Sequence, residues 1–174
     1  MAISNDQRVM IYDNDSSDGH DVYCYIPVRD LVGLNSRPFT VDYNTNCPDL
    51  STSWRLGIVY KQNPETGNVT CFVTLNRTDV KVGYVKVFVL VSYLDANGLV
   101  VHYPKLIGTG QILAGDKIQG SSEEARHPGY RSYIFSLGLF LRVSMFFRNC
   151  HSEARLHAKA RFCTGEKKMY RSKM

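Results

Sequence analysis

From residue 22 onward, apolar residues recur at every second position in a series of short segments separated by turn residues. The clearest example is the segment 85–92, in which four valines alternate with Lys, Phe, Leu and Ser. Successive side chains of a strand point to opposite faces, so a period of two predicts β-strands. The second face of this segment is also largely apolar, which predicts a central strand covered on both sides for most of its length.

The predicted strands follow one another closely, without an internal repeat or a convincing long helix. Asn97-Gly98 predicts a hairpin with a type I′ turn, because that turn needs positive φ at both central positions. Residues 115–129, polar and bounded by glycines, are expected to form the one long loop. We therefore predict an all-β fold, an antiparallel β-sandwich wrapped as a single jelly-roll with about eight to ten strands. The predicted strands are 22–28, 37–43, 54–60, 69–76, 85–92, 99–103, 106–113, 130–135 and 139–147, with 154–162 as a candidate tenth.

The length of 174 residues suits one domain with a single core. Charge divides the chain further, since residues 1–21 carry five Asp against one Arg, whereas residues 148–174 carry eight Lys or Arg against two Glu. The formal net charge of the whole chain is only +5. We expect an acidic, solvated N-terminal arm at 1–21, the sandwich at 22–149 and a basic C-terminal segment at 150–174. Met10 is a second candidate start of translation.

Residues 154–162 alternate small or apolar residues with basic ones. A strand would place these four basic side chains on one face, whereas a helix would scatter them around its axis. Ala, Lys and Arg also favour helices, so both alternatives stay open. A basic segment is typical of proteins that neutralise nucleic-acid phosphates, with a solubilising tail, an anionic membrane or an acidic partner as alternatives. The predicted nucleic-acid-binding residues are Arg148, Arg155, His157, Lys159, Arg161, Lys167, Lys168, Arg171 and Lys173.

Five cysteines, an odd number without close pairing, argue against a disulfide framework and for a reducing compartment. Most of them are expected to be small buried residues. Cys150, His151, His157 and Cys163 could be combined into a zinc set, but their spacing fits no usual zinc motif. The Asp-rich stretch 13–24 lacks the glycine position and the bidentate Glu of an EF-hand. We predict no metal site and no cofactor.

The sequence contains no Gly-rich phosphate loop, no nucleophile elbow, and no His-Glu-x-x-His or Cys-x-x-Cys motif. Its five histidines are scattered along the sequence. The position of Asp95 next to Asn97-Gly98 favours a role in the turn over a catalytic role. No apolar run of about 18 residues predicts a membrane span, and the first residues do not resemble a signal peptide. We expect a non-enzymatic protein that acts through contact.

The strand 85–91, Asp95 with the Asn97-Gly98 turn, and residues 104–107 resemble a central hairpin of small single jelly-roll capsid proteins of satellite-type RNA viruses. They also resemble the related jelly-roll core of plant-virus movement proteins. The first resemblance implies a sandwich whose copies, about sixty in the smallest shell, enclose single-stranded RNA. Such capsid proteins usually carry their basic arm at the N-terminus, whereas the basic segment here is C-terminal.

A second resemblance, to the TRAF-like or MATH sandwich, rests on residues 36–39, 54–58, 67–75 and 94–98. It implies a peptide-binding adaptor that reads an extended segment along a sheet edge or groove. The late Trp-Gly-Phe segment of that family has only Gly129-Tyr130 as a counterpart, and the next strand arrives early at Leu139.

The expected function is that of a viral capsid protein, found in the virion and, during assembly, in the host cytoplasm. Its expected partners are further copies of itself and single-stranded RNA, bound without sequence preference through the basic segment. A TRAF-like adaptor and a movement-type RNA-binding jelly-roll remain the alternatives.

Overall fold

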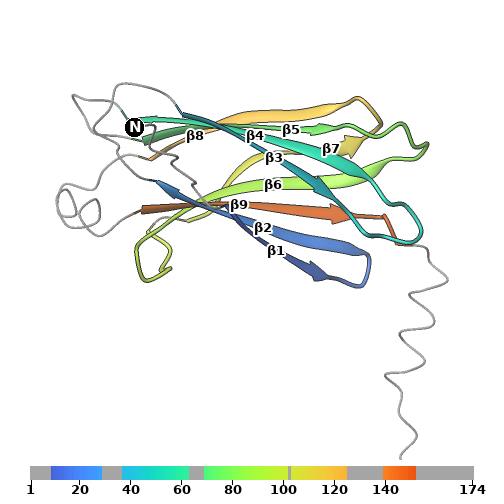
Figure 1. The fold of residues 1–174 in the computed structure, drawn as a ribbon, viewed down its shortest axis with the longest axis horizontal. Helices are drawn as coiled ribbons and strands as arrows, with labels where there is room; N and C mark the ends of the chain where they lie inside the picture. The colour runs from blue at the N-terminus through green and yellow to red at the C-terminus, as the bar shows by residue number, and fades with distance from the viewer. Residues whose placement is uncertain (1–8, 29–36, 63–68, 102, 125–138, 152–174) are drawn as a thin grey trace, which may run out of the picture.

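A computed structural model of the chain describes residues 9–28, 37–62, 69–101, 103–124 and 139–151. Within these ranges the secondary structure consists of strands that pack as two antiparallel layers (Figure 1). The predicted all-β antiparallel sandwich is therefore confirmed. None of the described residues forms a helix of the length and hydropathy needed to cross a membrane. The strands are β1 (Met10–Asp15), β2 (Gly19–Val28), β3 (Arg37–Asn44), β4 (Ser53–Gln62), β5 (Val69–Arg77), β6 (Val85–Leu94), β7 (Lys105–Ile112), β8 (Lys117–Glu124) and β9 (Leu139–Arg148).

Sheet A has the strand order β1-β2-β9-β6-β7, and sheet B has the order β3-β4-β5-β8. Three consecutive strands, β3, β4 and β5, form a meander within sheet B. In sheet A, β9 lies between β2 and β6 and pairs with both. The predicted central position of 85–92 is confirmed, because β6 has a partner on each side. The predicted cover on both faces is incomplete, because Lys86 is exposed and Phe88 and Leu90 are half-buried. The strand order establishes a sandwich of two antiparallel sheets, and the jelly-roll wrapping stays a prediction.

The core lies between the sheets and is built from every second residue of the strands. In β2 and β6 most inward positions are valine, cysteine or isoleucine, and their side chains are buried. Trp54 of sheet B and Phe147 of sheet A are among the largest buried side chains, and their ring centroids lie 4.8 Å apart between the sheets. Trp54 Nε1 donates a hydrogen bond of 2.7 Å to Thr52 Oγ1, so the polar edge of this buried ring is satisfied.

Two strands lie where the sequence predicted none. β1 occupies part of the expected acidic arm and pairs with β2 over its whole length. β8 occupies part of the expected long loop and pairs with β5. Within the described part of the chain both are edge strands, with one paired side each, and β1 is exposed at all its positions. Such strands need few apolar residues, which is why a hydrophobic period did not reveal them.

The turn at 95–98 differs from the predicted type I′. Gly98 has a φ of 79°, whereas Asn149 is the sole described non-glycine residue with positive φ, so Asn97 does not meet the type I′ requirement. Gly98 N donates to Asp95 O at 3.0 Å, and the Asp95 side chain accepts from the backbone of Asn97 and Leu99. The predicted turn role of Asp95 is confirmed. The expected return strand at 99–103 is reduced to one bridge between Leu94 and Val100.

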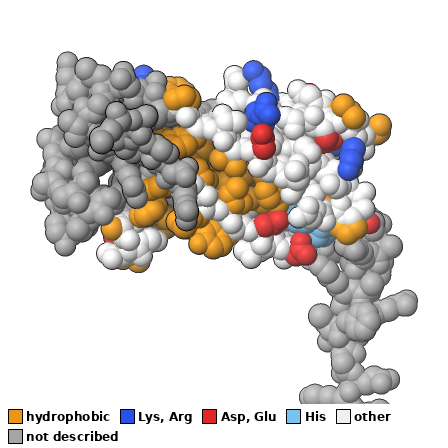
Figure 2. Space-filling view, viewed as in Figure 1, with side chains coloured by type: hydrophobic (Ala, Val, Ile, Leu, Met, Phe, Trp, Pro, Cys, Tyr) orange, Lys and Arg blue, Asp and Glu red, His pale blue; other side chains and the backbone are white. Residues whose placement is uncertain are grey.

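The two flanks of the sandwich differ. Where β7 meets β8, a Cβ on Gly120 would lie 2.7 Å from the carbonyl oxygen of Ile107, so the sheets approach closely. On the flank of β1 and β3, Tyr43 Oη donates a hydrogen bond of 2.5 Å to Asp13 Oδ2. Burial and this hydrogen bond raise the pKa of Tyr43. Figure 2 shows hydrophobic side chains gathered in the middle of one side of the molecule, beside groups of charged ones.

Candidate nucleic-acid interface

The outer face of sheet A is rich in aromatic and apolar side chains. It consists of the residues that alternate with the core positions, and the cross-strand register aligns them in rows. A sheet face that meets only water usually alternates polar residues with the core positions. A large apolar surface instead marks a contact site. The aromatic members of this face are Tyr12, Tyr23, Tyr25, Phe88, Phe140 and Phe146.

The rings on this face pack edge to face. Tyr23 and Phe146 have ring centroids 6.0 Å apart with planes at 88°, and Tyr12 and Tyr25 have centroids 5.4 Å apart with planes at 89°. This geometry suits the quadrupoles of the rings and contributes about 0.5–1.5 kcal/mol per pair. Tyr12 is 54% exposed and the other three are half-buried, so the rings are partly accessible.

Basic side chains lie among these rings. Lys86 Nζ lies 5.2 Å from the ring centroid of Phe88, and Arg148 Cζ lies 5.4 Å from that of Phe146. Arg142 is in the same strand as Phe146, and its Nη2 donates at 3.4 Å to Ser92 Oγ. Arg142 Nε is buried without a hydrogen-bond partner. The face therefore combines ring surfaces with donors that suit an anion.

Arg148, the one predicted nucleic-acid-binding residue among the described ones, is held by contacts within the chain. Its Nη2 lies 2.5 Å from Asp21 Oδ1 and its Nε lies 3.4 Å from Asp18 Oδ1. Its Nη1 donates to the carbonyl oxygens of His20 and Phe147 at 3.0 Å and 3.1 Å. A phosphate would have to compete with two carboxylates for this guanidinium. The residues predicted with it, namely Arg155, His157, Lys159, Arg161, Lys167, Lys168, Arg171 and Lys173, lie outside the described residues.

The outer face of sheet B has the composition expected of a solvent-facing sheet. Thr, Asn, Gln and Ser dominate it, and its ion pair between Arg55 and Asp42 joins Nε to Oδ1 at 2.8 Å with both side chains more than half exposed. The hydrogen bond from Arg55 lowers the pKa of Asp42. One exposed ring, Phe72, lies under Lys61 at 5.7 Å from Nζ to centroid. Among the described residues, the outer face of sheet B thus has one pair of a basic side chain and a ring, whereas sheet A has two.

The structure brings together a different set of metal-binding residue types from the one considered in the sequence. Cys150 and His151 lie beside His20 and Cys47, whereas His157 and Cys163 are outside the described residues. Cys24, Cys47, Cys71 and Cys150 are buried and free, which confirms the expectation of buried cysteines for these four. No local spacing in the sequence connects positions 20 and 47 with 150.

No family model matches the chain, and no curated protein matches it. A solved structure with partial similarity is the N-terminal endo-1,4-beta-D-xylanase 10B of Clostridium thermocellum, with its CBM22-1 and GH10 modules, at 12% identity and a TM-score of 0.26. Another is the enzymatically active domain of tailspike protein 4 of bacteriophage CBA120, at 10% identity and a TM-score of 0.22. These matches cover 82% and 69% of this chain, but only 27% and 19% of the other two.

Proposed function

We propose that this chain is a non-enzymatic structural protein that binds single-stranded RNA and assembles with further copies of itself, as a capsid protein does. The observation that carries the proposal is the outer face of sheet A, where the basic side chains of Lys86 and Arg142 lie among aromatic rings. Bases stack on aromatic side chains, and cations beside the rings neutralise the phosphates between them. The sheet supplies the base contacts, and the basic C-terminal segment supplies further charge.

The arrangement suits sequence-independent binding. Every base has a π-face, and stacking on one aromatic side chain contributes about 1–3 kcal/mol per base. Leu90 of β6 pairs with Ser144 of β9, and along the strands Lys86 lies on one side of this pair and Arg142 on the other. The two positive charges are therefore spread along the strand direction. Assembly would then multiply these contacts, because each copy brings the same face to one RNA. The apolar residues of the face that RNA leaves uncovered would be available to neighbouring copies.

Binding of a short fluorescein-labelled single-stranded RNA, followed by fluorescence anisotropy, tests the platform. Phe88→Ala and Phe146→Ala are expected to weaken binding roughly fivefold or more, which corresponds to one unstacked base. Phe72→Ala is the matched control, because it removes an exposed ring under a lysine from sheet B. Equal affinities for all three variants, with circular dichroism showing intact folds, would contradict a role of sheet A in RNA binding.

The basic segment is tested separately with Arg155, Lys159 and Arg161 replaced together by Ala. This variant is expected to bind less RNA and to lower the slope of log affinity against log salt by about 0.7 for each phosphate that is no longer neutralised. Assembly of the wild-type chain is measured by size-exclusion chromatography with absorbance at two wavelengths. The expected result is a large particle that contains nucleic acid, and a nucleic-acid-free monomer would overturn the proposal.

A peptide-binding adaptor of the TRAF-like kind is the second candidate, favoured by the edge of sheet A at β7. Among the described strands, β7 pairs only with β6. Two exposed apolar residues lie at this edge, Leu106 in β7 and Tyr103 just before it. An unpaired edge can accept an extended peptide as an added strand. The described residues of the segments that carry the TRAF-like resemblance lie in β3, β4 and β5 and at the end of β6 with the turn that follows it. A nucleic-acid-free monomer that binds a peptide, and no longer binds it when β7 is altered, would favour this candidate.

A further inference from the structure

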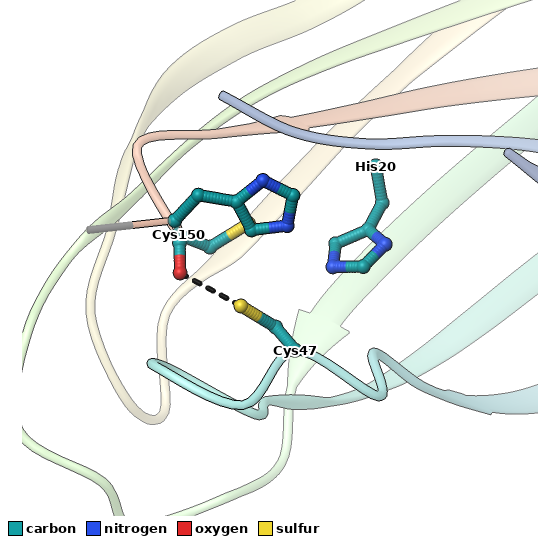
Figure 3. Close-up of side chains that lie close together, drawn as sticks. His20, Cys47 and Cys150 are labelled. Atoms are coloured by element: carbon teal, nitrogen blue, oxygen red, sulfur yellow. Dashed lines mark hydrogen bonds between the residues drawn. The ribbon is translucent and has the colours of Figure 1, made fainter. Parts of the chain in front are cut away.

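Four side chains with nitrogen or sulfur donors meet at one end of the sandwich. His20 is the second residue of β2, and Cys47 lies in the loop between β3 and β4. Cys150 and His151 follow the end of β9 after one residue, Asn149. One donor atom from each residue lies within 4.8 Å of the donor atoms of the other three. Figure 3 shows Cys47 and Cys150 close together, with the ring of His20 turned toward them. The four residues come from three separate parts of the sequence and from both sheets.

The cluster is shielded from water, and the ring nitrogens of His20 within it have no hydrogen-bond partner. His20, Cys47 and Cys150 expose 3%, 1% and 2% of their surface, and His151 is partly buried. Neither ring nitrogen of His20 makes a hydrogen bond. A buried donor or acceptor without a partner is costly, so nearly all such groups in native proteins are satisfied. The nitrogen that faces the cysteines therefore needs a ligand.

The donor set is one that zinc prefers. Two thiolates and two imidazoles form the Cys2His2 set of structural zinc sites, with Zn–S near 2.3 Å and Zn–N near 2.0–2.1 Å. A tetrahedron with these bond lengths separates its donor atoms by about 3.3–3.8 Å. The donor atoms, which lie within 4.8 Å of one another, are thus at most about 1.0–1.5 Å further apart than the metal requires, and side-chain rotation can supply this change. Two thiolates also balance the charge of Zn²⁺, so the buried complex is neutral.

His20 also has a carboxylate beside the ring nitrogen that would face away from the metal. Its Nδ1 lies 3.1 Å from Asp15 Oδ1 and 3.7 Å from Asp13 Oδ1, both in β1. The first contact is short but lies off the direction of a hydrogen bond. A small rotation of the ring would let Nδ1–H donate to Asp15, which orients Nε2 as the metal ligand, an arrangement that zinc-binding histidines commonly have. Figure 2 shows acidic side chains next to a histidine at this end of the molecule.

The backbone on both sides of the cluster is held in place. In the β3–β4 loop, Thr45 N donates to Thr52 O at 2.9 Å and Thr52 N donates to Thr45 Oγ1 at 2.8 Å, which closes the loop that contains Cys47. Cys47 Sγ donates to the carbonyl oxygen of Cys150 at 2.8 Å. After β9, Asn149 adopts a φ of 62°, which turns the chain toward the cluster. The donors are thus presented by ordered backbone rather than by long side chains.

We propose that His20, Cys47, Cys150 and His151 form a structural zinc site that joins the two sheets at this end of the sandwich. Binding of Zn²⁺ would release the two thiol protons and form two Zn–S and two Zn–N bonds, with no change in oxidation state. The metal would connect the β3–β4 loop of sheet B to the start of β2 and the end of β9 in sheet A. This site does not depend on the proposed RNA binding.

Metal content of the full chain, purified under reducing conditions with zinc present and then passed through gel filtration, tests the site. About one zinc per chain is expected, and loading with Co²⁺ is expected to give cobalt–thiolate charge-transfer bands. Cys47→Ser and His151→Ala should each lower the retained metal at least about tenfold. Cys71→Ser is the matched control, since Cys71 is equally buried but lies in β5 outside the cluster, and it should retain the metal.

The His151→Ala variant is expected to remain folded, because His151 is partly exposed and lies outside the strands. A loss of metal from this variant can therefore be assigned to the missing ligand and not to unfolding. Chelation should lower the melting temperature of the wild-type chain and leave that of His151→Ala unchanged. Absence of metal from folded wild-type chain with all thiols reduced would overturn the proposal. So would a disulfide between Cys47 and Cys150 in chain kept under reductant, or equal metal retention by the Cys47→Ser and Cys71→Ser variants.

Discussion

The guanidinium of Arg77 forms a two-pronged ion pair with the carboxylate of Asp79, two residues further along the chain. Arg77 Nε and Nη2 each lie 3.0 Å from one oxygen of Asp79. The remaining donors reach the carbonyl oxygens of Lys81, Gly83 and Ile112 at 3.1, 2.6 and 3.1 Å. Arg77 is 1% exposed, so this network satisfies a buried charge and fixes the loop between β5 and β6.

Replacement of Arg77 by Ala is expected to destabilise the fold by about 3–5 kcal/mol, because it leaves the Asp79 carboxylate and three carbonyl oxygens without their partner. Denaturant unfolding measures the change in free energy. Arg55→Ala provides the control, since the ion pair of Arg55 with Asp42 is exposed and its removal should have little effect. Similar destabilisation in the two variants would contradict the role given to the buried network.

The same ion pair predicts acid sensitivity. Burial acts to raise the pKa of Asp79, but hydrogen bonds from Arg77 and from the backbone of Ser53 and Lys81 outweigh it and lower the pKa to about 2. A carboxyl with a lowered folded-state pKa stabilises the fold above its unfolded pKa of about 3.9, and this contribution disappears as the pH falls through the folded-state value. The decrease in stability is expected to reach up to about 2 kcal/mol. Denaturant unfolding from about pH 5 down to about pH 2 should show it in the wild type and not in Asp79→Asn.

The close approach of β7 and β8 predicts a sharp difference between two glycines of sheet B. Gly120→Ala is expected to destabilise the fold by about 1–3 kcal/mol, because the new Cβ would lie 2.7 Å from the backbone oxygen of Ile107. Gly57→Ala is the control, since its Cβ would meet Thr74 O at an ordinary 3.8 Å. Thermal unfolding of both variants measures the difference, and equal melting temperatures would argue against tight contact at this flank.

Two cysteines of the core are expected to resist thiol reagents. Burial raises the pKa of both Cys24 and Cys71 to about 12, so the reactive thiolate is scarce at neutral pH and the sulfur is also inaccessible. Labelling with iodoacetamide followed by peptide mass spectrometry should find both unmodified in the native chain and modified after denaturation. Fast labelling of either residue in the native chain would show that the core opens locally.

Sequence patterns predicted most of the strands that line the core, because burial on one face imposes a period of two. The segments 54–60, 69–76 and 85–92 correspond closely to β4, β5 and β6. β1 and β8 were not predicted, since an edge strand can be held by backbone hydrogen bonds without an apolar period. The Asn97-Gly98 pair did mark a turn, but the side chain of Asp95 caps it in a form that the dipeptide alone does not specify.

The candidate sites depend even more on strand order. The aromatic face of sheet A needs β2, β9 and β6 side by side, and these strands are far apart in the sequence. The Cys and His cluster likewise joins residue 20 to residues 47, 150 and 151. Its spacing along the chain carries no signal, because the topology, and not a local motif, brings the donors together.

The position of β9 between β2 and β6 determines the order in which the two sheets can form during translation. Sheet B takes its strands from residues 37–62, 69–77 and 117–124, so it can form before residues 139–148 are translated. Sheet A cannot form completely at that stage, because its central strand β9 is translated last and must insert between β2 and β6. Until β9 is translated, the edges of β2 and β6 that it covers have no hydrogen-bonding partner. Chaperone binding during this interval would protect the nascent chain from aggregation through these unpaired edges.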